Sequence, residues 1–211
     1  MPRAFLFDYD DTLVQTRQCK FRALQALATR NYQLELSDAE LDRHWGVAYG
    51  ELFQRLFGAV EPDLSRVISA YEALDSEFEM TAYEESLRVL EALQVRHLVG
   101  VVTAAGRSIV ERQMSRLGFA VTGLVLLQTA EDTPHHKPDP RVFEPALREL
   151  AKHGVGAGDT TYVGDSLKDF HAARDAGLGF VGVLRGTTSK REFSEAGATT
   201  VESLDALLVR C

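Results

Sequence analysis

Short apolar segments alternate with amphipathic segments along most of the chain, and this pattern predicts a parallel α/β sheet. The first apolar run is 4–7, which a carboxylate-rich turn follows directly. Strands that are buried on both faces appear as continuous apolar runs, and parallel strands need crossover helices between them. We therefore expect strands at 4–7, 97–103, 124–128, 160–164 and 180–184, with helices at 84–93, 107–117, 141–153 and 167–176.

Residues 16–82 have a different character, because apolar residues recur there at helical spacing only. Ser37 begins one of these segments, with Glu40 three residues later, which is the pattern of a helix N-terminus. We therefore predict an α-helical domain over 16–82 that is inserted into an α/β core formed by 1–15 and 83–211. The expected core is a Rossmann-like parallel sheet with helices on both faces.

The composition is that of an ordinary globular protein, with 45% hydrophobic and 26% charged residues. The net charge of −8 repels phosphate backbones, so we expect neither a nucleic-acid nor an anionic-membrane partner. Cys19 and Cys211 fit no metal-site spacing and no disulfide framework. Neither a signal-peptide apolar region nor a run long enough to cross a bilayer is present, so the sequence predicts a cytoplasmic protein.

Polar side chains follow the predicted strands at the points where the strands end. The carboxyl ends of parallel strands meet at one edge of a sheet, and ligands bind at that edge. We therefore expect these side chains to lie close together, although they are distant in the sequence. They are Asp8 and Asp10 after the first strand, Thr103 after the second, Lys137 in the loop after the third, and Asp165 and Asp169 after the fourth.

Four carboxylates in one crevice cannot all be ionised without compensation. Two like charges about 4 Å apart repel by roughly 4 kcal/mol at an effective dielectric constant of about 20. Either the pKa values of the acids rise or a cation occupies the centre. A ligand set made of oxygen atoms suits a hard divalent ion, and Mg²⁺ bound by carboxylates together with a substrate phosphate is the expected case. The sequence therefore points to phosphoryl transfer.

Four ordered segments resemble the motifs of the haloacid dehalogenase superfamily of phosphatases. The likeness covers 4–14 and 83–210, and the helical insertion matches the cap domain of that family by position and character. The cap resembles the type found in phosphoglycolate phosphatases. The four segments are Asp8-Tyr9-Asp10-Asp11-Thr12, Val101-Val102-Thr103, Lys137-Pro138-Asp139-Pro140 and Gly164-Asp165-Ser166-Leu167-Lys168-Asp169.

This resemblance implies a catalytic role for several residues. Asp8 is the implied nucleophile, which forms an aspartyl-phosphate, and Asp10 is the implied general acid and base. Thr103, the backbone N–H of Ala104 and the ammonium group of Lys137 are expected to bind the phosphoryl oxygens. Phosphoryl transfer depends mostly on such positioning and charge neutralisation.

The resemblance also implies a Mg²⁺ site and a substrate-facing cap. Asp8, the backbone carbonyl of Asp10, and Asp165 are the implied metal ligands, and Asp169 holds a metal-bound water or fixes its neighbours. Helical caps of this superfamily reach over the active site, which makes residues beside the cap turn candidates for substrate contacts. We expect a small phosphorylated metabolite as substrate and a monomer or homodimer as the assembly. The candidate cap residues are Arg43, His44 and Tyr49.

Two positions depart from the family pattern. Asp11 stands where relatives usually carry Gly, so we expect a backbone conformation that Asp tolerates. The Asp11 charge lies near the site or points to solvent. Ala104 replaces a common Asn and so lacks one side-chain hydrogen bond to the nucleophile loop.

Other functions stay open at this point. A sugar phosphomutase of the β-phosphoglucomutase type would need cations in the cap turn, where this chain has Trp45 and Tyr49. A haloacid dehalogenase would lack an acid at the position of Asp10. A non-catalytic phospho-aspartate signalling domain would be much shorter and would have no helical insertion.

Overall fold

The computed structural model describes residues 2–45, 49–74 and 77–210, and the chain divides into two compact units. Met1–Gln15 and Thr81–Cys211 form one of them, called the sheet unit below. Thr16–Met80 forms the other, the helical unit. The chain therefore leaves the sheet unit soon after its first strand and returns to it at Thr81.

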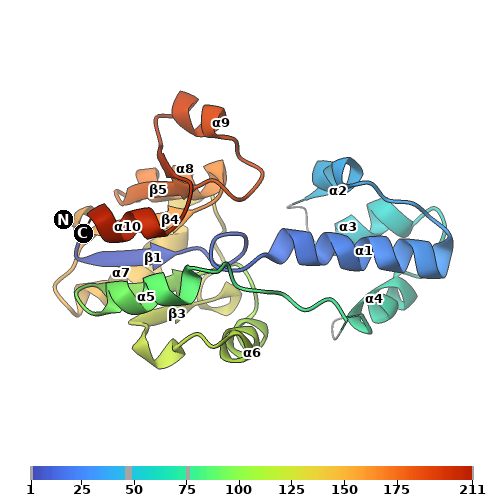
Figure 1. Cartoon of the computed structure of the whole chain (residues 1–211), viewed down its shortest axis with the longest axis horizontal. Helices are drawn as coiled ribbons and strands as arrows, with labels where there is room; N and C mark the ends of the chain where they lie inside the picture. Colours follow the sequence, from blue (N-terminus) through green and yellow to red (C-terminus); the bar gives the residue numbers. More distant parts are fainter. Residues whose placement is uncertain (1, 46–48, 75–76, 211) are drawn as a thin grey trace. The chain divides into compact units, whose positions relative to one another are not determined.

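The sheet unit is built on a six-stranded sheet in which all neighbouring strands are parallel. The strand order is β3-β2-β1-β4-β5-β6, so the chain adds two strands on one side of β1 before it crosses to the other side (Figure 1). The predicted Rossmann-like α/β fold is confirmed. The strands are β1 (Ala4–Phe7), β2 (Leu98–Val102), β3 (Leu126–Gln128), β4 (Thr160–Gly164), β5 (Gly179–Val183) and β6 (Thr199–Val201).

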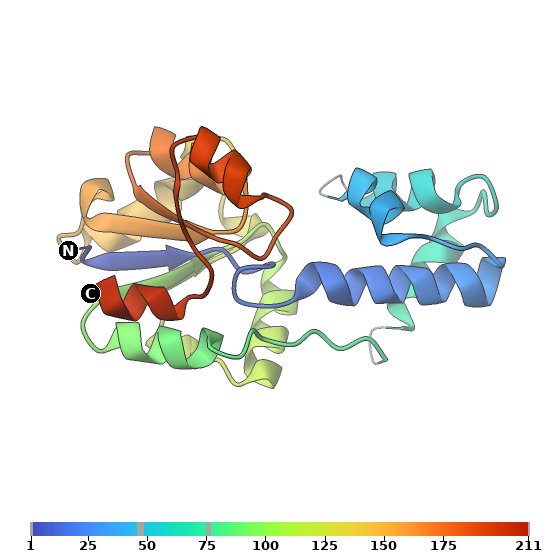
Figure 2. The same ribbon diagram turned by 45° about the horizontal axis from the view of Figure 1, so that its top comes forward.

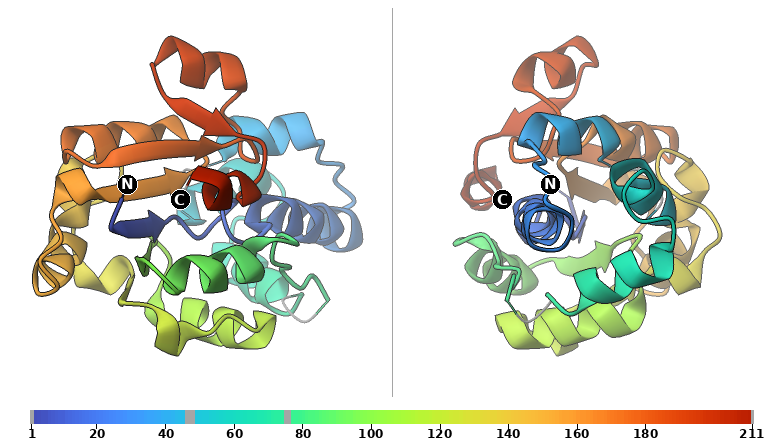
Figure 3. Two further views of the ribbon diagram at one scale, coloured as in Figure 1. Left: turned by 60° about the vertical axis from the view of Figure 1, so that its left-hand side comes forward. Right: turned by 90° about the vertical axis from the view of Figure 1, so that its right-hand side faces the viewer.

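Helices cover both faces of this sheet. Phe5 and Phe7 of β1 belong to the core beneath α5, α6 and α10, whereas Ala4 and Leu6 belong to the core beneath α7 and α8. Figure 3, left, shows α5 and α6 in green shades on one side of the sheet and α8 in orange on the other. Because successive strand side chains point to opposite faces, burial on both faces requires the uninterrupted apolar run of β1. The α-helices are α5 (Ser86–Gln94), α6 (Arg107–Leu117), α7 (Glu144–Ala151), α8 (Leu167–Asp175), α9 (Lys190–Glu195) and α10 (Asp205–Arg210); the 3₁₀ turns are η1 (Val121–Gly123), η2 (Ala130–Asp132), η3 (Pro140–Phe143) and η4 (Ala157–Asp159).

Several predicted boundaries differ from the observed ones. The strand expected at 124–128 begins at Leu126, because the 3₁₀ turn η1 precedes it. The helix expected at 141–153 is divided into η3 and α7, each of which has a proline in its first turn, where the missing N–H donor is not needed. The elements β6, α9 and α10 were not predicted, since β6 is only three residues long and two of them are Thr.

The described part of the helical unit contains four α-helices and no β-strand. Its longest helix is α1, with 17 residues (Figure 2). Ser37 caps α2 by accepting a hydrogen bond from the backbone N–H of Glu40, as predicted. Leu27, Phe53 and Phe57 are among the residues of its own apolar core. The helices are α1 (Thr16–Tyr32), α2 (Asp38–His44), α3 (Tyr49–Phe57) and α4 (Leu64–Glu72).

Of the described helices in both units, none could span a membrane. None of them combines the length and the apolar character that a bilayer-spanning helix needs.

Candidate active site

The candidate site lies at the carboxyl edge of the sheet, where the strand order reverses beside β1. Asp8 follows β1 and Asp165 follows β4, and these two strands are paired, so both acids leave the sheet at the same edge. The backbone N–H of Asp8 donates to the carbonyl of Val163 at 2.8 Å. Thr103 follows β2, which pairs with the other side of β1. Open α/β sheets bind ligands at such a reversal point.

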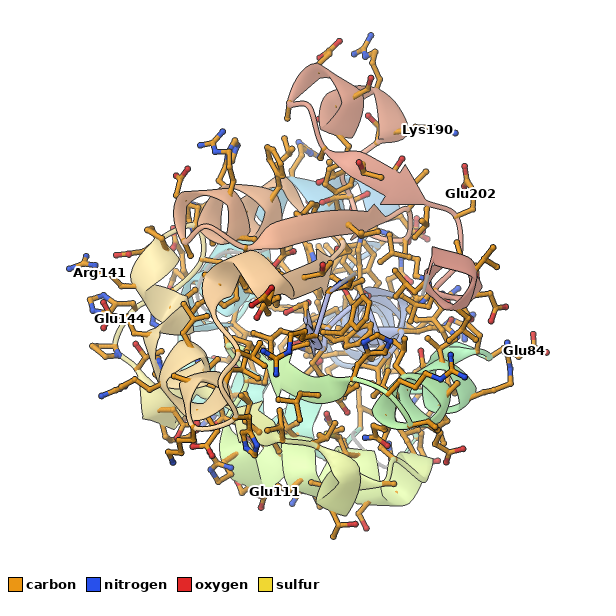
Figure 4. All side chains as sticks on the ribbon, turned by 90° about the vertical axis from the view of Figure 1, so that its left-hand side faces the viewer. Glu84, Glu111, Arg141, Glu144, Lys190 and Glu202 are labelled. Carbon is orange, nitrogen blue, oxygen red and sulfur yellow. The ribbon has the colours of Figure 1, made fainter. Side chains whose placement is uncertain are left out.

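Three buried or partly buried carboxylates form a cluster at this edge. Within the described residues, Asp8, Asp165 and Asp169 each offer a carboxylate oxygen that lies within 4.8 Å of the other two. Asp8 is only 6% exposed and Asp169 only 2%. Charged side chains ordinarily stay in water, as the exposed ones labelled in Figure 4 do. Those are Glu84, Glu111, Arg141, Glu144, Lys190 and Glu202.

The cluster disfavours its own ionisation. Burial is the main cause that raises the pKa of Asp8 to about 7; Lys137 opposes this rise, and the charges of Asp169 and Asp10 add to it. Burial, followed by the charges of Asp169 and Asp8, raises the pKa of the Asp165 carboxyl well above its usual range. A cation at the centre would relieve both effects.

Lys137 supplies one positive charge inside the cluster. Its Nζ atom donates to Asp8 Oδ1 at 2.5 Å and to the hydroxyl oxygen of Tyr162 at 2.9 Å, and it lies 2.6 Å from Asp169 Oδ1. Burial lowers the pKa of Lys137, but the charges of Asp169 and Asp8 outweigh burial and raise it well above its ordinary value. Lys137 therefore stays charged, and one ammonium group faces three carboxyl groups.

The donor set fits a hard divalent cation. Asp169 uses Oδ2 in a capping box at the start of α8, where it accepts from the backbone N–H of Ser166 at 3.0 Å and from its hydroxyl at 2.5 Å. Asp169 Oδ1 is buried and accepts no aligned hydrogen bond from the described residues. Clustered carboxylate oxygens with surplus negative charge are the ligands that Mg²⁺ prefers. Asp8, Asp165 and Asp169 are thus able to hold such an ion.

Asp10 and Thr103 meet beside the carboxylate cluster. Thr103 Oγ1 donates to Asp10 Oδ2 at 3.5 Å and accepts from the backbone N–H of Ala105 at 3.1 Å. Ala104 is exposed in the loop between β2 and α6. The structure therefore brings the side chains of Asp10 and Thr103 together.

The loop that carries Asp8 and Asp10 closes on itself. The backbone N–H groups of Leu13 and Val14 both donate to the carbonyl of Tyr9, at 2.9 and 3.2 Å. Asp11 has φ 54°, a left-handed conformation that Asp tolerates, so the expectation for this position is confirmed. The alternative that Asp11 points to solvent is wrong, because the closed loop leaves its side chain buried and only 5% of the residue exposed.

Sequence reasoning missed two residues of this site, Tyr162 and Gly186. Tyr162 is fully buried in β4, and its hydroxyl donates to the carbonyl of Val102 at 3.3 Å while it accepts from Lys137. The only signal was a phenol in a short strand that also carries two threonines. Gly186 follows β5, and a Cβ atom there would lie 1.8 Å from Asp165 Oδ2. Nothing in the sequence indicated that this backbone approaches a carboxylate.

The three candidate substrate contacts belong to the helical unit. The Nε atom of Arg43 donates to the carbonyl of Ala39 at 3.3 Å, and His44 Nδ1 lies 3.4 Å from Nη1 of Arg55. The turn at 46–48 and the side chain of Tyr49 lie outside the described residues. A substrate role for Arg43, His44 and Tyr49 stays a prediction.

Comparison with known proteins gives relatives over nearly the whole chain. An N-acetylmuramic acid 6-phosphate phosphatase from Pseudomonas aeruginosa is 30% identical over 83% of this chain and 78% of its own length. A phosphoglycolate phosphatase from Rhodospirillum rubrum is 28% identical over 95% and 87% of the two chains. A solved Thermotoga maritima protein, provisionally assigned as a β-phosphoglucomutase, superposes with a TM-score of 0.80 over 98% and 97% at 22% identity, which shows a shared fold.

The family assignment rests on a match that spans most of the sheet unit and the inserted helices. The sequence profile of the haloacid dehalogenase-like hydrolases matches residues 5–183. Residues 5–7 of the first strand, the acidic edge and β5 all fall inside this match. The expectation of a hydrolase of this superfamily is thereby confirmed, and the chain belongs to the haloacid dehalogenase-like hydrolases.

Proposed function

We propose that this protein is a Mg²⁺-dependent phosphatase that hydrolyses small phosphomonoesters through an aspartyl-phosphate on Asp8. The observation that carries the proposal is the contact of Lys137 with Asp8 inside a carboxylate cluster at the sheet edge. A buried carboxylate paired with a fixed cation suits a nucleophile that meets a phosphate dianion. The names of the phosphatase relatives support the same reaction class.

The first half-reaction transfers the phosphoryl group to the protein. A carboxylate oxygen of Asp8 attacks phosphorus, and the bond between phosphorus and the ester oxygen breaks. Asp10 gives its proton to the departing alkoxide, so that a neutral alcohol leaves. Thr103 and Lys137 neutralise and orient the phosphoryl oxygens, which Lys137 can do because it remains charged beside Asp8.

The second half-reaction restores the carboxylate. Asp10, now ionised, takes a proton from a water molecule that attacks phosphorus, and the bond between phosphorus and Asp8 breaks. Inorganic phosphate leaves with Asp8 ionised and Asp10 protonated again. Asp8, Asp165, the Asp10 carbonyl and, directly or through water, Asp169 would hold Mg²⁺, which would supply a positive charge beside the transferred group.

The substrate class that we propose is a small soluble organic phosphate of the phosphoglycolate type. The relatives act, by their names, on phosphoglycolate and on a sugar-acid phosphate. An inserted helical domain in an enzyme of this type shields the intermediate from untimely water and leaves little room for a macromolecular ester. Arg43, His44 and Tyr49 are the residues proposed to contact the part of the ester that is not transferred.

The decisive experiment measures phosphate release from a panel of esters with Mg²⁺ and with a chelator. We expect release that needs Mg²⁺, no turnover in Asp8→Asn, and a loss of about 10²- to 10⁴-fold in Asp10→Asn. Asp205→Asn is the matched control, because Asp205 is an exposed acid of α10 in the same unit. Near-normal turnover in Asp10→Asn would contradict its role, and hydrolysis by Asp8→Asn would mean direct attack by water.

The same panel separates the alternatives. A sugar phosphomutase would convert one sugar phosphate into an isomer without net release of phosphate. A signalling domain would keep a phosphoryl adduct for minutes and would not turn over an aryl phosphate. Rapid release from several small esters supports the phosphatase.

A further inference from the structure

The turn after β5 carries Arg185, whose largely buried side chain has partners on two separate segments of the chain. Its Nη1 atom donates to the carbonyl of Thr12 at 2.7 Å, and Nη2 pairs with the carboxylate of Glu85. The guanidinium lies over the ring of Tyr83, with Cζ 3.9 Å from the ring centroid. The side chains of Arg185 and Glu85 are 7% and 13% exposed, so this pair is largely shielded from water.

Glu85 is itself held by two further donors, which meet the same oxygen that pairs with Arg185. Ser203 Oγ donates to Glu85 Oε1 at 2.7 Å, and the backbone N–H of Leu204 donates to the same oxygen at 3.2 Å. Burial alone would raise the pKa of Glu85, but these hydrogen bonds and the charge of Arg185 outweigh burial and lower it. The carboxylate therefore stays ionised, and Arg185 is bound to a fixed anion.

Thr12 is the other end of this arrangement. It lies in the closed loop that begins with Asp8 and Asp10, and it is fully buried. Arg185 is the side chain that supplies a donor to its carbonyl oxygen. A buried carbonyl without a donor is strongly unfavourable, so loss of Arg185 would favour a rearranged loop. The path of the loop from Asp8 to Thr12 thus depends on where the guanidinium stands.

The residue after Arg185 reaches the opposite side of the site. A Cβ atom on Gly186 would lie 1.8 Å from Asp165 Oδ2, so the backbone of the turn lies against that carboxylate. One short turn therefore contacts the loop of Asp8 and Asp10 through Arg185, and the Asp165 carboxylate through Gly186. A shift of the turn would displace both sides of the site together.

We propose that Arg185 is a positioning residue for the reaction. Its guanidinium is fixed by Glu85 and donates to the Thr12 carbonyl, and it thereby holds the Asp8–Asp10 loop in place. The proposal rests on the proposed phosphatase function, because its rate effect is a phosphatase rate. Arg185 touches none of Thr103, Lys137 or the carboxylate cluster in the described contacts. Its removal should therefore reduce kcat more than it changes KM.

The test compares Arg185→Met with Arg88→Met. Arg88 of α5 forms an exposed ion pair with Asp205 of α10, but it does not contact Thr12. In Arg185→Met we expect kcat to fall by about 10- to 100-fold, the loss that a small misplacement of reacting groups produces, with KM changed by less than about 3-fold. We expect amide hydrogen exchange in residues 11–14 to rise by about 10-fold or more. Arg88→Met should change neither quantity.

A second pair of variants separates positioning from stability. Arg185→Met leaves Glu85 as a buried, unpaired charge, so the double variant Arg185→Met/Glu85→Gln should recover Tm but not kcat. Arg185→Lys keeps the charge and provides a milder case if Arg185→Met does not fold. Its ammonium group lacks the fork that bridges Thr12 and Glu85, so kcat should still fall.

The outcomes decide the proposal in each case. Recovery of wild-type kcat together with Tm in the double variant would show a merely structural role and would overturn it. Wild-type kcat and loop exchange in Arg185→Lys or Arg185→Met would overturn it as well. Absence of phosphate release by the unmodified protein would refute the proposed function and the rate effect with it. Loop exchange would still report whether Arg185 holds the Thr12 carbonyl.

Discussion

Replacing the proposed nucleophile, Asp8→Asn, should abolish turnover and yet make the metal-free protein more stable at neutral and alkaline pH. Burial, more than any neighbour, raises the pKa of Asp8 from its ordinary value of 3.8 to about 7. The folded protein therefore retains a proton on Asp8 over a pH range in which the unfolded chain has lost it. Stability from this group is complete below pH 3.8 and is lost as the pH rises through 7.

The size of the effect follows from that displacement of the pKa. Each pH unit corresponds to about 1.4 kcal/mol, so the full displacement corresponds to about 4 kcal/mol at pH values above both pKa values. An asparagine side chain cannot titrate and resembles the neutral acid in shape. We therefore expect Asp8→Asn to be more stable than the wild type by up to about 4 kcal/mol near pH 8, with the difference fading toward pH 4.

Urea unfolding between pH 4 and pH 8, with a chelator present, measures this difference directly. The wild type should lose stability with rising pH more steeply than Asp8→Asn, and Asp205→Asn should follow the wild type. Added Mg²⁺ should stabilise the wild type more than Asp8→Asn, because a ligand that binds the folded state alone raises its stability. An Asp8→Asn variant that is less stable than the wild type near pH 8 without metal would refute the reasoning.

Three further substitutions probe the rest of the site. Lys137→Met leaves Asp8 and Asp169 without their cation. We therefore expect kcat to fall by about 10²- to 10³-fold and urea unfolding to show a destabilisation of about 3–5 kcal/mol. Wild-type values of both quantities would contradict the ion-pair geometry. Gly186→Ala pushes a Cβ atom against Asp165, so a Mg²⁺ titration should show that the affinity for Mg²⁺ is weakened by about 10- to 100-fold. The control is Gly158→Ala, where a Cβ atom meets nothing within 4 Å, and this variant should bind Mg²⁺ as the wild type does. Tyr162→Phe removes the hydroxyl that accepts from Lys137. Thermal unfolding should therefore show a loss of stability of about 1 kcal/mol, and kcat should fall by less than about 10-fold. A loss of kcat as large as that of Lys137→Met would mean that the hydroxyl itself contacts substrate.

Sequence patterns predict the parts of this fold in which burial alone decides the residue type. The runs at β1 and β2 are apolar because both faces of the sheet are covered, and the acids that follow β1 and β4 lie together because the strands end at a common edge. The short strand β6 escapes such reasoning, since Thr199 and Thr200 are exposed or half-buried and only Val201 belongs to the core. Pairing with β5 makes β6 a strand, and that pairing is a tertiary contact.

The candidate site was predictable where charge and position coincide, and unpredictable where backbone geometry matters. Asp8 and Asp165 follow directly from acids placed at strand ends, and Asp169 from an acid in the first turn of the helix after β4. Tyr162 is a fully buried strand residue whose hydroxyl reaches the site, and Gly186 matters only because its missing side chain leaves space for a carboxylate. From residue type alone, Tyr162 looks like an ordinary core residue and Gly186 like an ordinary turn glycine.

Asp169 divides its two oxygens between separate tasks, with Oδ2 closing the first turn of α8 and Oδ1 facing the ammonium group of Lys137. Any substitution there removes a helix cap and a site ligand at once. A change at this position therefore lowers both stability and activity and cannot raise one at the expense of the other. Laboratory evolution toward heat resistance should therefore leave residue 169 unchanged. Stabilising substitutions should instead accumulate on the outer helices, where a side chain does not serve a helix cap and the site together.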